Sequence, residues 1–188
     1  MMGFRCSILY FRESSKTAIL DAAGFTESTT EDSYNEEQFS GASINESSYL
    51  IWQNWRKGSL SEPDYIRISN DISLLACDVC ETTMFCSTSF FRGGKQVWSV
   101  AHNPEYGLDH VSLTGDVPDT ITATVTTLRE EAKISQEGVD DVDFYFEVPV
   151  ELFRTISGVR HDLVNSFSFY ALEFKQAAPK KRFWKLWR

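Results

Sequence analysis

Apolar and polar residues alternate most clearly in the middle of the chain, over residues 76–115. Residues 84–90 alternate, and a second alternating run, QVWSVAH, follows the pair Gly93-Gly94. Two glycines between such runs favour a tight hairpin, because both turn positions can take positive φ without a Cβ clash. A second reversal at residues 103–107 leads into residues 108–114. The pattern therefore predicts an antiparallel meander.

Upstream of the meander, periodicity and turn residues predict two strands, two helices and one long loop. The loop is predicted because its Ser-, Thr-, Glu- and Asn-rich sequence has almost no apolar periodicity. In chain order, these elements are a strand over residues 4–11, a helix capped by Ser14 or Ser15 and ended by Gly24, an acidic surface loop over residues 24–48, a strand over residues 49–55 and a helix over residues 64–75.

Downstream of the meander, the sequence predicts a helix over residues 120–136, a strand over residues 143–148, a short helix opened by Pro149 and stopped by Gly158, and a last strand over residues 166–174. Strands joined mostly by hairpins, with helices inserted between them, are typical of an α+β fold. We expect one α+β domain over residues 1–174, with a mainly antiparallel sheet of five or more strands, about four helices packed on it, and a basic aromatic tail over residues 175–188.

The charge of the chain is uneven. Removing the six cations of residues 175–188 from the net charge of −9 leaves −15 on residues 1–174. A body this acidic disfavours nucleic-acid binding, which needs Lys and Arg for phosphate contacts, and favours a basic protein partner or simple solubility. No apolar stretch approaches the roughly 20 residues that span a bilayer, so we expect a cytoplasmic protein.

The four cysteines are sparse and predict buried, reduced thiols, in keeping with the cytosol. Cys77 and Cys80 form a CxxC motif, but a redox pair belongs at a helix N-terminus after a strand. A zinc site needs a second pair of ligands at similar spacing. His102 and His110 are the residues available for such a pair, and we expect neither a bound metal nor a cofactor.

No nucleophile, phosphate-binding or zinc-hydrolase motif is present. Histidines are the natural groups for acid–base chemistry at neutral pH, and they define a candidate polar cluster at strand ends. Within it, Asp162 is placed to orient His161. The cluster comprises His102, His110, Glu147, Arg160, His161 and Asp162. The alternative is that these groups cap strands and turns.

The tail, KKRFWKLWR, mixes cations with aromatic residues. That composition suits weak contact with an anionic membrane surface, a docked terminal segment or a disordered basic end, and the sequence leaves these three open.

Four segments carry a resemblance to known proteins: GFRCS from Gly3, GGKQVWSVAH from Gly93, FYFEVPVEL from Phe144 and GVRHD from Gly158. Over most of the chain, apart from the acidic loop and the tail, the sequence resembles an uncharacterised family of small bacterial cytosolic proteins. The resemblance implies a bacterial source and one compact domain, and it implies no activity.

Together these features favour a non-enzymatic binding protein of the immunity type, which neutralises a bacterial toxin by occluding its active site. The expected contacts with the basic partner are five acids of the 24–48 segment, Glu27, Glu31, Asp32, Glu36 and Glu37. The main alternative is a small enzyme or ligand-binding domain that uses the polar cluster. Oligomeric state is left open.

Overall fold

The computed structural model describes residues 3–139, 141–163 and 166–175. Within them the chain forms nine strands in a single antiparallel sheet and four α-helices, which confirms the predicted α+β class. The strands are β1 (Arg5–Arg12), β2 (Phe25–Glu31), β3 (Phe39–Asn45), β4 (Ser48–Asn54), β5 (Leu74–Cys80), β6 (Phe85–Phe91), β7 (Gln96–His102), β8 (Ser112–Gly115) and β9 (Tyr170–Phe174). The helices are α1 (Lys16–Ala23), α2 (Glu62–Ile68), α3 (Asp119–Gln136) and α4 (Glu147–Ser157), with short 3-10 turns η1 (Pro104–Tyr106) and η2 (Phe144–Phe146).

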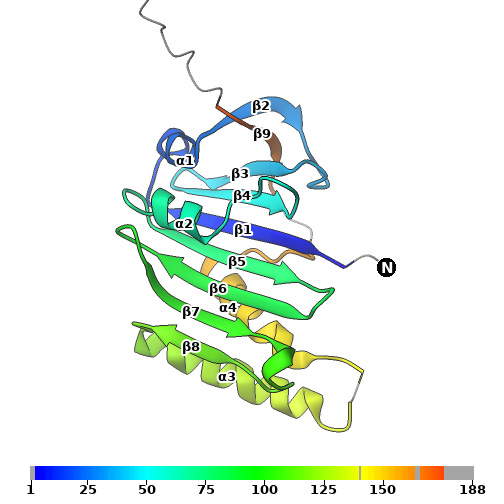
Figure 1. Cartoon of the computed structure of the whole chain (residues 1–188). Helices are drawn as coiled ribbons and strands as arrows, with labels where there is room; N and C mark the ends of the chain where they lie inside the picture. Colours follow the sequence, from blue (N-terminus) through cyan, green and yellow to red (C-terminus); the bar gives the residue numbers. More distant parts are fainter. Residues whose placement is uncertain (1–2, 140, 164–165, 176–188) are drawn as a thin grey trace, which may run out of the picture.

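The sheet order is β2-β9-β3-β4-β1-β5-β6-β7-β8 (Figure 1). The predicted meander is confirmed as β5 to β8, and β1 joins it to β4 by pairing with both β4 and β5. The last strand, β9, returns from the far end of the chain and inserts between β2 and β3. The C-terminal strand therefore lies between two strands from the first quarter of the chain, and β2 forms one of the two edges of the sheet among the described residues.

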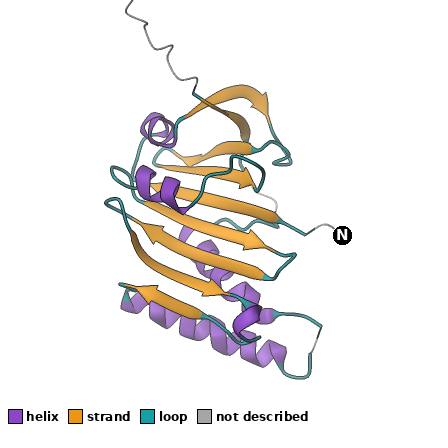
Figure 2. Cartoon of the chain, viewed as in Figure 1, coloured by secondary structure: helices purple, strands orange, loops and turns teal. Residues whose placement is uncertain are grey.

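Helices cover both faces of the sheet. Helices α1 and α2 pack over β1, β4 and β5 through a core that contains Ile19, Tyr65 and Ile68. Helices α3 and α4 pack on the opposite face through a core that contains Val125, Leu152 and Phe153. Alternation along each strand divides its side chains between the two cores. Neither α1 nor α2 extends over β6 and β7, so these two helices leave that part of the same sheet face uncovered (Figures 1 and 2).

Helix ends follow the predicted signals. Ser15 caps α1 by accepting from the backbone N–H of Ala18 at 3.3 Å, and Gly24 ends the helix in the left-handed region. The α2 prediction holds only in part, because a capping box between Ser61 and Asp64 starts the helix, which ends at Ile68. Leu74 and Leu75, assigned to that helix from the sequence, begin β5 instead.

The prediction of a surface loop over residues 24–48 is wrong. Most of this segment is strand, as β2 and β3, and only residues 32–38 connect them. Because β2 is a polar edge strand and β3 is built largely from small residues, neither shows the apolar alternation that marks a half-buried strand. At Gly41, in the centre of β3, a Cβ would overlap the hydroxyl of Tyr49.

The strand predicted over residues 143–148 is also wrong. Asp143 Oδ1 accepts the backbone N–H groups of Tyr145 and Phe146 at 3.1 and 3.2 Å, and so starts the turn η2 that runs into α4. The alternating apolar pattern of this stretch suggests a strand, but the hydrogen bonds from the Asp143 side chain to the backbone favour a helical turn instead. The last predicted strand is confirmed only over Tyr170–Phe174. Of the predicted tail, only Lys175 is among the described residues.

Candidate functional site

The acids expected to contact a partner lie at the β2 edge of the sheet, on β2 and the turn after it. Glu31, Glu36 and Glu37 are exposed, and none of them forms an ion pair with another described residue. We call residues 31–37, which carry these three carboxylates, the acidic turn.

Asp32 and Glu27, which the sequence groups with those contacts, have internal roles instead. Asp32 is only 7% exposed, and its carboxylate accepts the backbone N–H groups of Glu36 (2.8 Å) and Glu37 (3.1 Å) and the hydroxyl of Ser40. Glu27 accepts the hydroxyl of Tyr49 at 2.7 Å and pairs with Lys16. Asp32 therefore organises the acidic turn from inside and offers little surface to a partner.

The acidic turn is also held from β4. The side-chain amide of Asn54 donates to the carbonyls of Asn35 and Glu37, each at 2.6 Å, and Arg56 donates to the carbonyl of Glu36 at 2.7 Å. These bonds fix the backbone between the exposed carboxylates. The turn is thus an ordered feature of the surface, because its backbone polar groups have internal partners.

The predicted polar cluster divides into separate groups. His102 is fully buried, with Nε2 at 2.9 Å from Asp143 Oδ2 and Nδ1 at 2.7 Å from the carbonyl of His110. His110 Nδ1 accepts the backbone N–H of Asn103 at 3.1 Å, and the two rings lie 6.5 Å apart, so their predicted proximity is confirmed. Both ring nitrogens of His102 thus face acceptor groups, a carboxylate and a backbone carbonyl. His102 bridges β7, the turn before β8, and η2.

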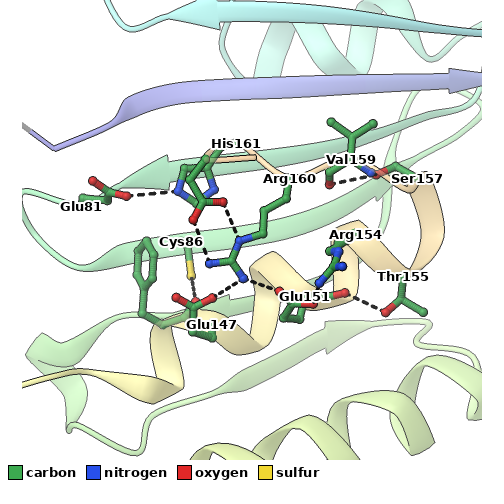
Figure 3. A network of polar contacts seen from close by, with 12 residues as sticks. Glu81, Cys86, Glu147, Glu151, Arg154, Thr155, Ser157, Val159, Arg160 and His161 are labelled. Carbon is green, nitrogen blue, oxygen red and sulfur yellow. Dashed lines mark hydrogen bonds and ion pairs between the residues drawn. The ribbon is translucent and has the colours of Figure 1, made fainter. Parts of the chain in front are cut away.

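Arg160 forms the centre of a second group, on α4 and the segment after it. Its guanidinium pairs with Glu147 at 2.7 Å, with Glu151, and with Asp162 at 2.6 Å. Figure 3 shows the guanidinium between Glu147 and Glu151. Asp162 is therefore a partner of Arg160, whereas the sequence places it beside His161.

His161 points away from that group. Its Nε2 lies 3.1 Å from Glu81 Oε1 (Figure 3). Its ring packs edge-on against Phe4, with the ring centroids 5.2 Å apart. The side chain is 2% exposed, and its Nδ1 is buried with no hydrogen-bond partner among the described residues. His161 thus joins the start of β1 to the end of β5 and does not meet His102.

The ion pairs around Arg160 keep both Arg160 and Asp162 charged. Burial alone would lower the pKa of Arg160, but hydrogen bonds to Asp162 and Glu147 outweigh it and raise the pKa above its usual range. Burial alone would raise the pKa of Asp162, and its hydrogen bond with Arg160 more than reverses this, so the pKa is lowered. Groups shifted in these directions stay ionised at neutral pH, as expected of structural ion pairs rather than of a proton donor or base.

A pocket of about 400 Å³ lies beside this ion-pair group, between α3 and α4. Asp143, Glu147 and Arg160 contribute to its wall, so one pocket touches both the His102 group and the Arg160 group. No nucleophilic Ser, Thr or Cys with an adjacent base lines it among the described residues. Of its polar wall, Asp143, Glu147, Glu151 and Arg160 are engaged in internal ion pairs, whereas Glu131 forms none with a described residue.

The CxxC pair cannot act as one unit. Cys77 packs in the core under α4, and alternation along β5 places Cys80 on the other face of the sheet. The cysteines are free and buried. Over the described ranges, no group of three His, Cys, Asp or Glu side chains is arranged to hold a metal ion.

No protein-family model, no curated protein and no solved structure matches the chain. The family resemblance in the sequence therefore remains a prediction, and the site must be judged on its own geometry.

Sequence reasoning missed one polar group, around Asp78. This carboxylate lies in the middle of β5, within the otherwise apolar run LLACDVC, and it accepts the hydroxyl of Ser7 at 2.5 Å. A single acid inside an apolar strand was the signal that could have found it, because a buried carboxylate is costly unless it is hydrogen-bonded.

Proposed function

We propose that the protein is a non-enzymatic binding protein of the immunity type, which neutralises a basic partner, such as a nuclease-like toxin domain, by occluding its active site. The observation that carries this proposal is the acidic turn. Three exposed carboxylates stand on a backbone that Asp32, Asn54 and Arg56 hold in one conformation.

An ordered turn favours binding because less conformational entropy is lost when the complex forms. Binding a partner through these three carboxylates would break no internal ion pair, since none of them forms one among the described residues. The −15 charge of residues 1–174 adds a long-range attraction for a cationic surface, which speeds association more than it sets the final affinity. Charge and shape at this edge thus support the same kind of partner.

The residues of the candidate polar cluster form ion pairs within the chain, and this favours a binding protein over an enzyme. His102, Arg160 and His161 each bond to carboxylate groups of the same chain, and they do so in three separate places. A small enzyme would need some of these groups to converge on free space with an open coordination or hydrogen-bond position. The pocket between α3 and α4 does bring Asp143, Glu147 and Arg160 to one cavity, but each of them is already paired within the chain, so the enzyme alternative is the weaker one.

A cytoplasmic location, and weak contact of the tail with a membrane surface, belong to the same proposal. No described helix has both the length and the apolar composition to cross a membrane. Residues 176–188 lie outside the described part of the chain, so a role for the tail rests on its composition alone.

The test is a side-by-side capture experiment from the native cells. The tagged wild-type protein is compared with a variant carrying Glu31→Lys, Glu36→Lys and Glu37→Lys. A matched control carries Glu105→Lys, Glu130→Lys and Glu137→Lys, which reverse three exposed acids elsewhere. We expect one basic protein to co-purify at a near-equal amount with wild type and control, and to fall at least about tenfold with the acidic-turn variant.

Equal capture by all three proteins would contradict the proposal.

A further inference from the structure

A groove of about 520 Å³ lies on the sheet face that α1 and α2 leave uncovered, on the opposite side from α3 and α4. One wall is the segment from Trp55 to the start of α2, and the floor is formed by β5, β6 and β7. We call it the serine groove. Its volume lies within the range of small-molecule sites, roughly 300–1,000 Å³.

Small side chains make the floor. Ser89 pairs with Ser99 across β6 and β7, their hydroxyls 2.8 Å apart, and Ser87 pairs with Ala101. On the other side of β6, Ser87 lies opposite Asp78. Serine and alanine are poor strand formers, so their concentration on one face leaves space above the sheet at some cost in strand propensity.

Two hydrogen-bond chains converge on Asp78 at the end of this floor. In the first, Trp55 Nε1 donates to Ser7 Oγ at 2.7 Å, and Ser7 donates to Asp78 Oδ1 at 2.5 Å. In the second, Gln53 Nε2 donates to Tyr65 Oη at 3.0 Å, and Tyr65 donates to Asp78 Oδ1 at 3.3 Å.

Gln53 is itself fixed by both backbone groups of Leu60, whose N–H it accepts at 2.8 Å and whose carbonyl it reaches at 3.0 Å. Ser7 and Gln53 are each 1% exposed, so this network is part of the interior although it ends at the groove. Such a supported network holds the Asp78 carboxylate in a fixed position.

Asp78 retains acceptor capacity. A carboxylate has about four lone-pair sites, and the two hydrogen bonds above both use Oδ1. Burial raises the pKa of Asp78, while hydrogen bonds from Ser7, Tyr65 and Ser87 oppose that rise. A cationic group in the groove would also stabilise the ionised form of Asp78, and more strongly than these neutral donors because it carries a full positive charge.

The rest of the lining selects against anions. Among the described residues that form it, Asp78 and Glu62 are acidic and none is Lys, Arg or His. Four aromatic side chains contribute to the lining. Trp55 and Phe85 are partly exposed, whereas Tyr65 and Phe91 are buried and their rings pack edge-on at 5.6 Å. Aromatic faces and a carboxylate together are the usual recognition chemistry for a desolvated cation.

We propose that the serine groove binds a small organic cation through a guanidinium group, with Asp78 as its anionic partner and the partly exposed rings of Trp55 and Phe85 against its planar faces. A guanidinium suits this lining better than an ammonium, because it stacks on aromatic rings and directs its N–H donors in one plane toward carboxylate and hydroxyl oxygens. This binding site is separate from the acidic turn and goes beyond the proposed function.

The experiment is isothermal titration of the full chain with three probes that differ only in the head group. Nα-acetyl-arginine methylamide carries the guanidinium, Nα-acetyl-citrulline methylamide is its neutral isostere, and Nα-acetyl-lysine methylamide carries an ammonium. We expect saturable 1:1 binding of the arginine probe, at least about tenfold weaker binding of the citrulline probe, and intermediate binding of the lysine probe.

Variants connect the result to the groove. Asp78→Asn keeps the side-chain shape and should weaken the arginine probe at least about tenfold, while Glu62→Gln at the exposed rim should weaken it about two- to threefold. Ser89→Val fills the floor without changing the carboxylate and should also weaken binding of the arginine probe. The proposal can therefore still be tested if Asp78→Asn fails to fold. The matched control is Asp116→Asn, an exposed acid outside the groove, which should leave binding unchanged.

No saturable binding of the arginine probe up to about 10 mM, or equal binding of the citrulline probe, would overturn the proposal. Tighter binding of the lysine probe would overturn the choice of guanidinium. The acidic-turn variant should bind the arginine probe within about threefold of wild type, since the turn lies outside the groove. The serine groove and the partner-binding proposal can therefore fail independently.

Discussion

Replacing Asp32 by alanine tests whether this buried carboxylate organises the acidic turn. The substitution removes the acceptor of the Glu36 and Glu37 backbone N–H groups and of the Ser40 hydroxyl. Hydrogen bonds to a charged group contribute about 1.5–3 kcal/mol each. Water can replace the carboxylate at the two N–H groups, because Glu36 and Glu37 are exposed, but Ser40 is 0% exposed and stays unpaired. We therefore expect a loss of about 3 kcal/mol in the free energy of unfolding.

For a chain of this length, that loss corresponds to a fall of about 6–12 °C in Tm, measured by thermal denaturation followed by circular dichroism. The matched control is Glu31→Ala, one residue away and exposed, which should change the free energy of unfolding by less than about 0.5 kcal/mol. If Asp32→Ala lowered Tm no more than Glu31→Ala, the carboxylate would not be holding the turn, and the argument for an ordered acidic surface would fail.

Three further changes probe the fold and its polar groups by urea denaturation. Gly41→Ala should cost about 1–3 kcal/mol, because the new Cβ overlaps the Tyr49 hydroxyl; an unchanged midpoint would mean that residues 39–45 are not packed as β3. Asp78→Asn should gain stability relative to wild type as pH rises from about 4 to 7, since the raised pKa of Asp78 means that ionisation opposes folding; a constant difference would contradict that direction. Arg160→Gln should cost about 3 kcal/mol at pH 7 and less at pH 3, because Arg160 lowers the pKa of Asp162 and that stabilisation is lost as pH falls; equal losses would show that the ion pairs contribute little.

Strands whose apolar residues alternate were predictable, and strands made of small or polar residues were not. β7 carries a clear period-2 pattern, β1 is a short apolar run bounded by charged residues, and the Ser15 and Gly24 caps define α1 locally. By contrast, β2 pairs with β9, a strand from the far end of the chain. β3 pairs mainly with the next strand, β4, but its small residues give no apolar alternation. Pairing over such a sequence separation leaves no local signal, so the 24–48 segment looked like a loop.

The candidate site shows the same limit. The sequence marked the acidic segment and the histidines, but it could not show that Asp32 turns inward or that Asp162 pairs with Arg160. The Asp78 group brings together Ser7, Gln53, Tyr65 and Asp78 from β1, β4, α2 and β5. These elements become neighbours only through the sheet order, so residue spacing along the chain cannot reveal the group.

The most direct test of the central claim is neutralisation of the captured partner in living cells. The partner is expressed alone, with the wild-type protein, with the Glu31, Glu36 and Glu37 charge-reversal variant, and with the matched Glu105, Glu130 and Glu137 control, and growth is measured. We predict that the partner alone arrests growth, that wild type and control restore it, and that the acidic-turn variant does not. Growth restored equally by the acidic-turn variant, or a partner that is harmless alone, would contradict the account.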